Sequence, residues 1–170
     1  MGSIGRFNLL LLLITLGTAA SNGQGGQKPP HTYVDVGACP FECCTYRKWT
    51  VAEKVTVLDS PNGKHVIETL AKGDVVTGLT GEVISVPIPA KADRDVPETP
   101  IKKGDTFYVL HYDGEGYWKV WLDGKITFVH ESVMDFPHPK AEWWVKIKDS
   151  HGTVGWALST NNFAHQDACE

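Results

Sequence analysis

The chain has 170 residues, a formal net charge of −4 and a hydrophobic content of 42%. This content suffices for a packed core and excludes a wholly disordered chain. The acidic balance, without a stripe of lysine and arginine, argues against a nucleic-acid-binding surface. The length suits one domain or two very small ones.

The first 20 residues have the order of a secretory signal peptide. Arg6 precedes an apolar run over residues 9–16, and small residues follow at 17–20. The run is much shorter than the roughly 20 residues that a membrane span needs. We therefore predict cleavage after Ala20, no membrane span in the mature chain and a periplasmic or secreted location. An uncleaved anchor is the alternative, but nothing charged follows to stop transfer.

Residues 21–37 begin with a stretch rich in Gly, Gln and Pro and are predicted to be a flexible leader. A cysteine cluster follows, with Cys39, Cys43 and Cys44, and Cys169 is the penultimate residue. Four cysteines fit disulfides in an oxidising compartment. A bond between the adjacent Cys43 and Cys44 would strain the peptide, so each should pair with Cys39 or Cys169. Zinc is disfavoured because Cys169 lacks a neighbouring ligand.

Short strands separated by turns are predicted for the next segment. Apolar and β-branched runs lie at 55–58, 66–70, 75–79 and 83–86, and turn residues lie at 59–63, 72–74 and 80–82. Turn signals at this spacing favour a barrel or a sandwich. Four prolines between residues 87 and 100 then predict a surface loop or linker, because proline cannot donate to a strand ladder.

Strand signals return in the second half, and two of them repeat earlier patterns. Further strands are expected at 107–110, 117–121, 126–129, 143–148 and 151–158, with a hairpin turn at Asp123-Gly124. Lys103-Gly104-Asp105 repeats Lys72-Gly73-Asp74, and residues 117–120 resemble 144–147 in their order of aromatic, lysine and β-branched residues. These echoes hint at duplication. Only residues 130–135 suggest a helix, and that segment is too short to be stable alone.

Three segments together resemble the bacterial SH3-like (SH3b) domain family. They are residues 55–61 (Val-Thr-Val-Leu-Asp-Ser-Pro), residues 67–76 (Ile-Glu-Thr-Leu-Ala-Lys-Gly-Asp-Val-Val), and residues 144–147 (Trp-Val-Lys-Ile) followed by 152–157 (Gly-Thr-Val-Gly-Trp-Ala). Residues 38–46 resemble a leader found on some exported uncharacterised members. The resemblance implies an all-β fold of small SH3-like barrels. It also implies that Cys39 pairs with Cys44, because glycine is typical at the position matching Cys43, and this leaves Cys43 for Cys169.

The third segment lies unusually far from the first two for so small a barrel. We therefore expect either one barrel with a β insertion at about 87–140 or two intertwined or tandem barrels. The predicted organisation is a signal peptide at 1–20, a leader at 21–37, an SH3-like domain at 38–165 and a C-terminal tail at 166–170. Residues 51–86 and 141–158 should share one compact β unit, because either segment alone would leave ladder groups unpaired.

No pattern in the chain predicts catalysis. The seven histidines show no His-Glu-x-x-His spacing, and no Gly-x-Ser-x-Gly motif occurs. Asp113, Glu115 and Asp123 cluster in sequence, but they lie at turns, where acidic residues are favoured for local hydrogen bonds. We predict no catalytic residue, no metal and no cofactor, with a small secreted hydrolase as the alternative.

Aromatic residues are the candidate ligand-binding residues. They are Tyr112, Tyr117, Trp118, Trp121 and Trp143. Because side chains alternate along a strand, Trp118 and Trp121 should face apart, as must the adjacent Trp143 and Trp144. The sequence predicts an exported non-enzymatic binding module for a cell-wall peptide, a glycan or a protein partner. The resemblance implies peptidoglycan or an envelope protein; a structural or interaction subunit without a small ligand is the alternative.

Overall fold

The computed structural model describes residues 26–169, in which strands and loops enclose two separate hydrophobic cores. No α-helix occurs among these residues, and a 3-10 turn, η1 (Glu131–Val133), lies within residues 130–135, the segment that suggests a short helix in the sequence. The predicted all-β, barrel-like class is confirmed. The predicted signal peptide lies outside the described residues. Within the described part, no helix is long and apolar enough to cross a membrane.

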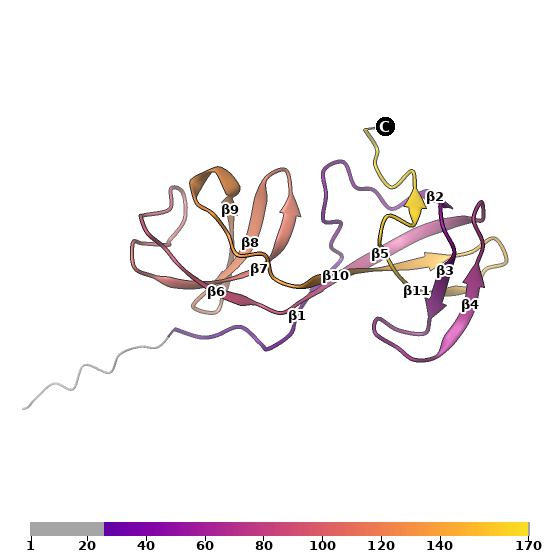
Figure 1. The fold of residues 1–170 in the computed structure, drawn as a ribbon, viewed down its shortest axis with the longest axis horizontal. Coiled ribbons are helices and arrows are strands. Elements are labelled where there is room, and N and C mark those ends of the chain that lie inside the picture. Colours follow the sequence, from indigo (N-terminus) through magenta and orange to yellow (C-terminus); the bar gives the residue numbers. More distant parts are fainter. Residues whose placement is uncertain (1–25, 170) are drawn as a thin grey trace, which may run out of the picture.

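Two lobes make up the described chain (Figure 1). The first lobe comprises residues 33–86 and 141–169, and the second lobe comprises residues 87–140. The strands of the first lobe are β1 (Tyr33–Val36), β2 (Lys48–Val51), β3 (Val55–Leu58), β4 (Val66–Leu70), β5 (Val75–Ser85), β10 (Ala141–Lys148), β11 (Val154–Leu158) and β12 (Phe163–Ala164). Those of the second lobe are β6 (Ile88–Lys91), β7 (Thr106–Gly114), β8 (Tyr117–Leu122) and β9 (Lys125–His130).

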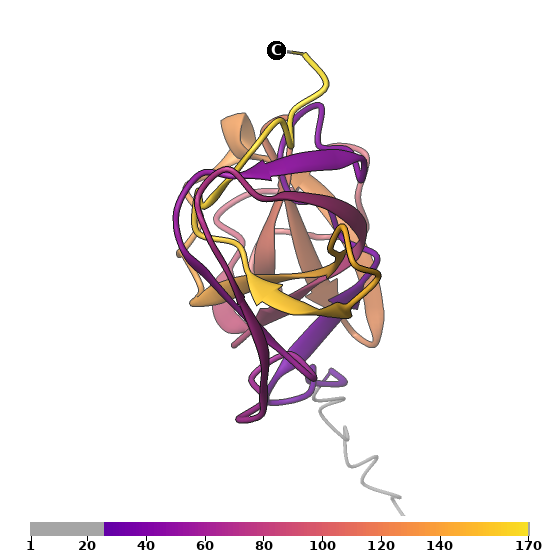
Figure 2. The same ribbon diagram turned by 90° about the vertical axis from the view of Figure 1, so that its right-hand side faces the viewer.

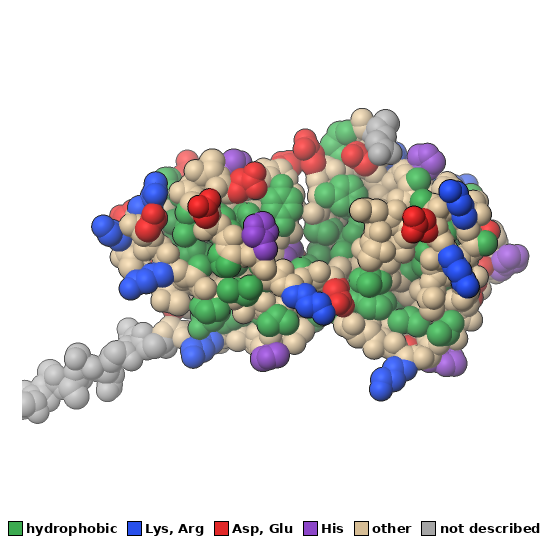
Figure 3. Space-filling view, viewed as in Figure 1, with side chains coloured by type: hydrophobic (Ala, Val, Ile, Leu, Met, Phe, Trp, Pro, Cys, Tyr) green, Lys and Arg blue, Asp and Glu red, His purple; other side chains and the backbone are tan. Residues whose placement is uncertain are grey.

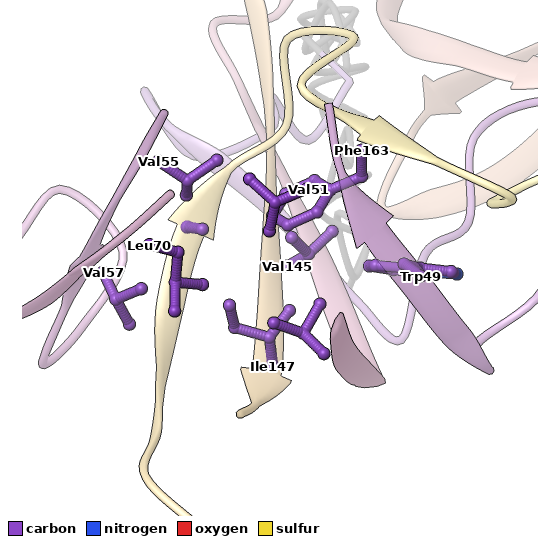
Figure 4. Close-up of a cluster of buried hydrophobic side chains, with 10 residues drawn as sticks. Trp49, Val51, Val55, Val57, Leu70, Val145, Ile147 and Phe163 are labelled. Atoms are coloured by element: carbon purple, nitrogen blue, oxygen red, sulfur yellow. The ribbon is translucent and has the colours of Figure 1, made fainter. Parts of the chain in front are cut away.

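The first lobe is one curled sheet in the order β12-β2-β5-β10-β11-β3-β4, with β1 added to β5. Strands β5 and β10 pair antiparallel from Ser85 opposite Ala141 to Thr77 opposite Lys148. The prediction that residues 51–86 and 141–158 share one β unit is therefore confirmed. Viewed end-on, the strands surround an interior (Figure 2). Trp49 and Phe163 fill that interior together with aliphatic side chains (Figure 4).

The second lobe is a four-stranded antiparallel sheet in the order β6-β7-β8-β9. It has its own core, in which Phe107, Ile101 and Val120 are fully buried. The chain enters this lobe from the end of β5 and returns from it into β10. The two strands that connect the lobes are thus paired with each other, which holds both ends of the inserted segment.

The two Lys-Gly-Asp turns have the same conformation. Gly73 and Gly104 adopt positive φ angles of 95° and 92°, which glycine tolerates without steric cost. Each donates its N–H over 2.8 Å to a carbonyl, that of Val51 in the first lobe and that of Ala92 in the second. The following aspartate accepts a backbone N–H three residues earlier in both turns.

Strand register extends this correspondence. Gly78 comes four residues after the aspartate of the first turn and lies opposite Ile147. Val109 comes four residues after the aspartate of the second turn and lies opposite Val120. The order β2-β5-β10-β11 in the first lobe thus matches β6-β7-β8-β9 in the second. Segments 144–147 and 117–120, whose sequences echo each other, occupy equivalent positions.

The prediction of a flexible leader over 21–37 is wrong at its C-terminal end. Residues Tyr33–Val36 form β1 and pair with β5 from Ser85 to Glu82. The physical reason is an open edge. On that side, β2 covers β5 only from Val75 to Thr77, so the far end of this long strand leaves backbone groups that β1 satisfies.

Candidate binding cleft

Trp118 and Trp121 face opposite sides of the second sheet, as the alternation predicts. Trp118 is 6% exposed and stacks on Phe136 in the core, with ring centres 5.6 Å apart. Trp121 is half-buried on the outer side and donates its Nε1–H over 2.6 Å to the carbonyl of Gln27 in the leader. Trp118 therefore belongs to the core of the second lobe and is not part of an exposed binding surface.

Tyr112 and Trp143 are held by neighbours. The Tyr112 hydroxyl accepts the N–H of Gly116 over 2.8 Å, and its ring meets Trp118 edge-on at 5.5 Å. Trp143 is half-buried in the first lobe and contacts the ring of Phe41 edge-on at 5.5 Å. Trp143 therefore supports the cysteine-rich loop, whereas Tyr112 lies on the core side of the second sheet.

Tyr117 lines a cleft between the two lobes. The space-filling view shows a hollow where the lobes meet (Figure 3). The cleft has a volume of about 520 Å³ and is lined by Cys39, Phe41, Glu42, Cys43, Cys44, Asp113, Gly114, Glu115, Tyr117 and Phe128. Tyr117 is 43% exposed and Phe128 is 46% exposed. This volume lies within the range of small-molecule sites. Of the five predicted binding residues, only Tyr117 lines this cleft. Trp143 does not line it but contacts Phe41, which does.

The first wall of the cleft is the disulfide-bonded loop. Cys39 bonds Cys44, and Cys43 bonds Cys169, which confirms the predicted pairing. The loop is further closed by an N–H of Cys44 that donates to the carbonyl of Phe41 over 3.2 Å. Phe41 and Glu42 are thereby presented from a short covalently closed segment. The bridges are compatible with an oxidising compartment.

Two half-buried aromatic side chains anchor this loop to the first lobe. The carbonyl of Ala38, just before the first cysteine, accepts hydrogen bonds from the Tyr46 hydroxyl and from Trp143 Nε1. Burial raises the pKa of Tyr46 to about 12, so its hydroxyl keeps its proton and donates. Both side chains lie close over Gly81, where a Cβ atom would collide with them.

The second wall is formed by β8, β9 and the turn before β8. Tyr117 and Phe128 are on the outer face of the second sheet because they alternate with the core residues Trp118 and Val129. Gly114 approaches the backbone of Phe41 so closely that an added Cβ would lie 3.2 Å from its carbonyl carbon. The two walls therefore meet at Gly114.

A charged network lies beside the cleft, on the same face of the second sheet as Phe128, and joins the lobes. Lys119 on β8 forms ion pairs with Asp35 on β1 and, over 3.1 Å, with Asp113 on β7. His111 on β7 is 1% exposed, and its Nε2 lies 2.9 Å from the Asp35 carboxylate. Tyr33 stacks on the His111 ring. The first lobe thus provides the central carboxylate, and the second lobe provides its cation.

Electrostatics favours the ionised forms of Asp35 and Lys119. Burial by itself raises the pKa of Asp35, but hydrogen bonds from His111 and Lys119 outweigh it and hold that pKa below its ordinary value. Burial lowers the pKa of Lys119, and the two carboxylates reverse this and raise it. Burial and the negative charge of Asp35 raise the pKa of Tyr33.

These side chains do not form a recognisable catalytic or metal centre among the described residues. Asp35, His111 and Asp113 have the spacing of metal ligands, but the ammonium group of Lys119 lies between the two carboxylates. Cys43, Asp167 and Cys169 also cluster, but the two sulfurs are bonded to each other. Among the described histidines, His111 and His151 each contact a carboxylate and His130 contacts the hydroxyl of Ser132, and none of these three contacts both kinds of group.

No family model, curated protein or solved structure matches this chain. The resemblance to the SH3-like family therefore rests on the sequence segments that carry it.

The residues that sequence reasoning missed are Phe41, Glu42 and Phe128 in the cleft, and the Asp35–Lys119 ion pair beside the cleft. A signal existed for Phe128, because a two-residue turn at Asp123-Gly124 fixes the register that places it opposite Lys119. Nothing in the sequence pairs Asp35 with Lys119, which are 84 positions apart.

Proposed function

We propose that this protein is an exported, non-enzymatic binding module of the SH3-like type that holds its ligand in the interlobe cleft. The observation that carries the proposal is the exposure of both Tyr117 and Phe128 in one cleft whose opposite wall is covalently fixed. Exposed aromatic side chains in a concave site commonly mark recognition. The ligand classes are a cell-wall peptide, a glycan or an envelope protein.

Export and a periplasmic or secreted location belong to the same proposal. The predicted signal peptide and two disulfides support it, because disulfides persist in oxidising compartments. Rigidity also suits binding. A wall closed by two bridges loses little conformational entropy when a ligand is bound, so more of the interaction energy remains for affinity.

Co-sedimentation with isolated peptidoglycan tests the proposal. The wild-type protein should sediment with it, and a Tyr117→Ala/Phe128→Ala variant should bind at least about tenfold more weakly, since two exposed aromatic contacts are removed. A Val66→Ala/Val75→Ala variant is the matched control, because both valines are exposed outside the cleft. The control should bind as the wild type does.

Three other results would contradict parts of the proposal. Unchanged binding by the Tyr117→Ala/Phe128→Ala variant would place the site elsewhere. No sedimentation of the wild-type protein would exclude the cell-wall ligand and favour a structural subunit. Release of soluble sugar or amino groups from the peptidoglycan would show a hydrolase.

A further inference from the structure

We propose that the interlobe cleft selects peptides that carry a cationic side chain of the lysine or arginine type. This inference rests on the proposed function, because it names the chemical class of ligand for the same cleft. Charge complementarity, exposed aromatic rings and an internal precedent for holding an ammonium group carry it.

The charge of the lining is the first observation. The cleft is lined by the carboxylates of Glu42, Asp113 and Glu115 and by no lysine or arginine. Asp113 is paired with Lys119, but within residues 26–169 neither Glu42 nor Glu115 has an ion-pair partner. These two glutamates lie on opposite walls of the cleft. A cation bound between the walls is attracted by both, and an anion is repelled by both.

The aromatic rings are the second observation. Phe41 comes from the first lobe, and Tyr117 and Phe128 come from the second. The face of an aromatic ring attracts a lysine ammonium or an arginine guanidinium within about 6 Å of its centre. The aliphatic stem of such a side chain packs on the same rings while its charged end reaches a carboxylate. A neutral sugar would use the rings but would leave the two glutamates without a cation.

The chain itself holds a cation in this way beside the cleft. The Lys119 ammonium group lies 5.3 Å from the ring centre of Phe128 and forms ion pairs with Asp35 and Asp113. Lys119 is 13% exposed, so this arrangement is largely closed to solvent. In the lining of the cleft, Phe128 is joined by Tyr117, Glu42 and Glu115, which repeat the combination of rings and carboxylates. The cleft thus offers a second place for the chemistry that already binds Lys119.

A peptide is the occupant that fits both features. Lysine and arginine side chains combine an apolar stem of several methylene groups with a terminal cation. The volume of about 520 Å³ accommodates such a side chain with its flanking backbone. We therefore expect the cleft to recognise one basic side chain of an extended peptide.

Titration of the isotopically labelled protein with capped tripeptides, followed by NMR, tests this inference. The probes are acetyl-Ala-Lys-Ala-amide and the same peptide with norleucine or glutamate at the centre. The lysine peptide should shift amide resonances at residues 41–43, 115–117 and 128. It should bind at least about fivefold more tightly than the norleucine peptide, in line with one or two partly exposed ion pairs. The glutamate peptide should bind more weakly than either.

Two charge-matched variants identify the groups responsible. Glu42→Gln/Glu115→Gln should remove the preference for lysine over norleucine. Glu53→Gln/Glu98→Gln changes the net charge equally at exposed sites outside the cleft and should keep that preference.

Equal binding of lysine and norleucine peptides would overturn the inference, as would a preference that survives Glu42→Gln/Glu115→Gln. If peptidoglycan is bound through Tyr117 and Phe128 while no lysine preference exists, this inference fails and the proposed function stands. If the wild-type protein binds neither peptidoglycan nor peptides, both fail.

Discussion

The first and second lobes each place a lysine over an aromatic ring at equivalent strand positions. In the first lobe the Lys146 ammonium lies 5.7 Å from the ring centre of Trp156, and in the second Lys119 lies 5.3 Å from that of Phe128. Among the described residues Lys146 forms no ion pair, whereas Lys119 forms two. Asp113 on β7 provides one of these two partners, and Asp35 on β1 of the first lobe provides the other. Because β1 provides Asp35, the lysine of the second lobe also joins the two lobes, and we call this Asp35–Lys119 ion pair the clamp.

Covalent restraint is the other difference between the lobes. Both disulfides lie in the first lobe, and residues 87–140 contain no cysteine. The second lobe depends on its core, on the paired strands β5 and β10 at its base, and on the Asp35–Lys119 contact. The first lobe therefore serves as the fixed frame, and stability changes should differ according to which lobe is altered.

The largest effect should come from removing the long disulfide. Cys43→Ser/Cys169→Ser opens a link of sequence separation 126, whereas Cys39→Ser/Cys44→Ser opens one of separation 5. Loop-closure entropy predicts losses in the free energy of unfolding of up to roughly 5 kcal/mol for the first and about 2 kcal/mol for the second. Denaturant unfolding under non-oxidising, non-reducing conditions measures both. Equal losses would show that strain or residual structure outweighs chain entropy.

The second effect compares two tryptophans on opposite faces of β8. Trp118→Ala should lower the free energy of unfolding by about 3–5 kcal/mol, because it empties a buried ring site. Trp121→Ala removes a half-buried ring and its hydrogen bond to Gln27, so a loss of about 1 kcal/mol is expected. Urea unfolding of both variants provides the measurement. If the two variants are destabilised equally, both rings contribute to the core.

The sequence predicted strand positions more successfully than contacts between strands. Alternation along residues 117–121 correctly separated Trp118 from Trp121, and the repeated Lys-Gly-Asp turn hinted at a duplication before the register was known. These features are local, since they depend on the side-chain alternation of a strand and on the φ angle of one glycine. Local rules therefore sufficed for the fold class.

The cleft and the clamp depend on contacts that local rules do not specify. Residues 33–36 look like the end of a leader until the open edge of β5 is known, and only then does Asp35 come within reach of Lys119. Phe41 likewise carries no periodic signal inside a cysteine cluster, and its exposure depends on where the second lobe is placed. The position of a site between two lobes is a property of their docking.

The smallest effect concerns the two equivalent lysines and gives the most specific test of the clamp. Lys119→Met leaves Asp35 and Asp113 without a cation, so the free energy of unfolding at pH 7 should fall by about 1–3 kcal/mol, which allows for the partial exposure of the carboxylates. Lys146→Met, the matched control, removes only a cation–π contact, and a loss of about 0.5–1 kcal/mol is expected.

The pH dependence distinguishes charge from packing in this pair. Because the pKa of Asp35 is lowered by folding, its contribution to stability is present above the unfolded pKa of about 3.9 and is lost as pH falls through the folded pKa. Because the pKa of Lys119 is raised by folding, its contribution is present below about pH 10.4 and is lost as pH rises through the folded value.

The deficit in the free energy of unfolding of Lys119→Met relative to the wild type should therefore be constant between about pH 5 and 9 and shrink toward pH 3. Chemical denaturation at pH 7 and pH 3 measures it, with Lys146→Met correcting for the general effect of acid. A deficit at pH 3 as large as that at pH 7 would mean that Lys119 stabilises the junction through its aliphatic stem, because an ionic contribution declines once the pH falls below the unfolded pKa of Asp35.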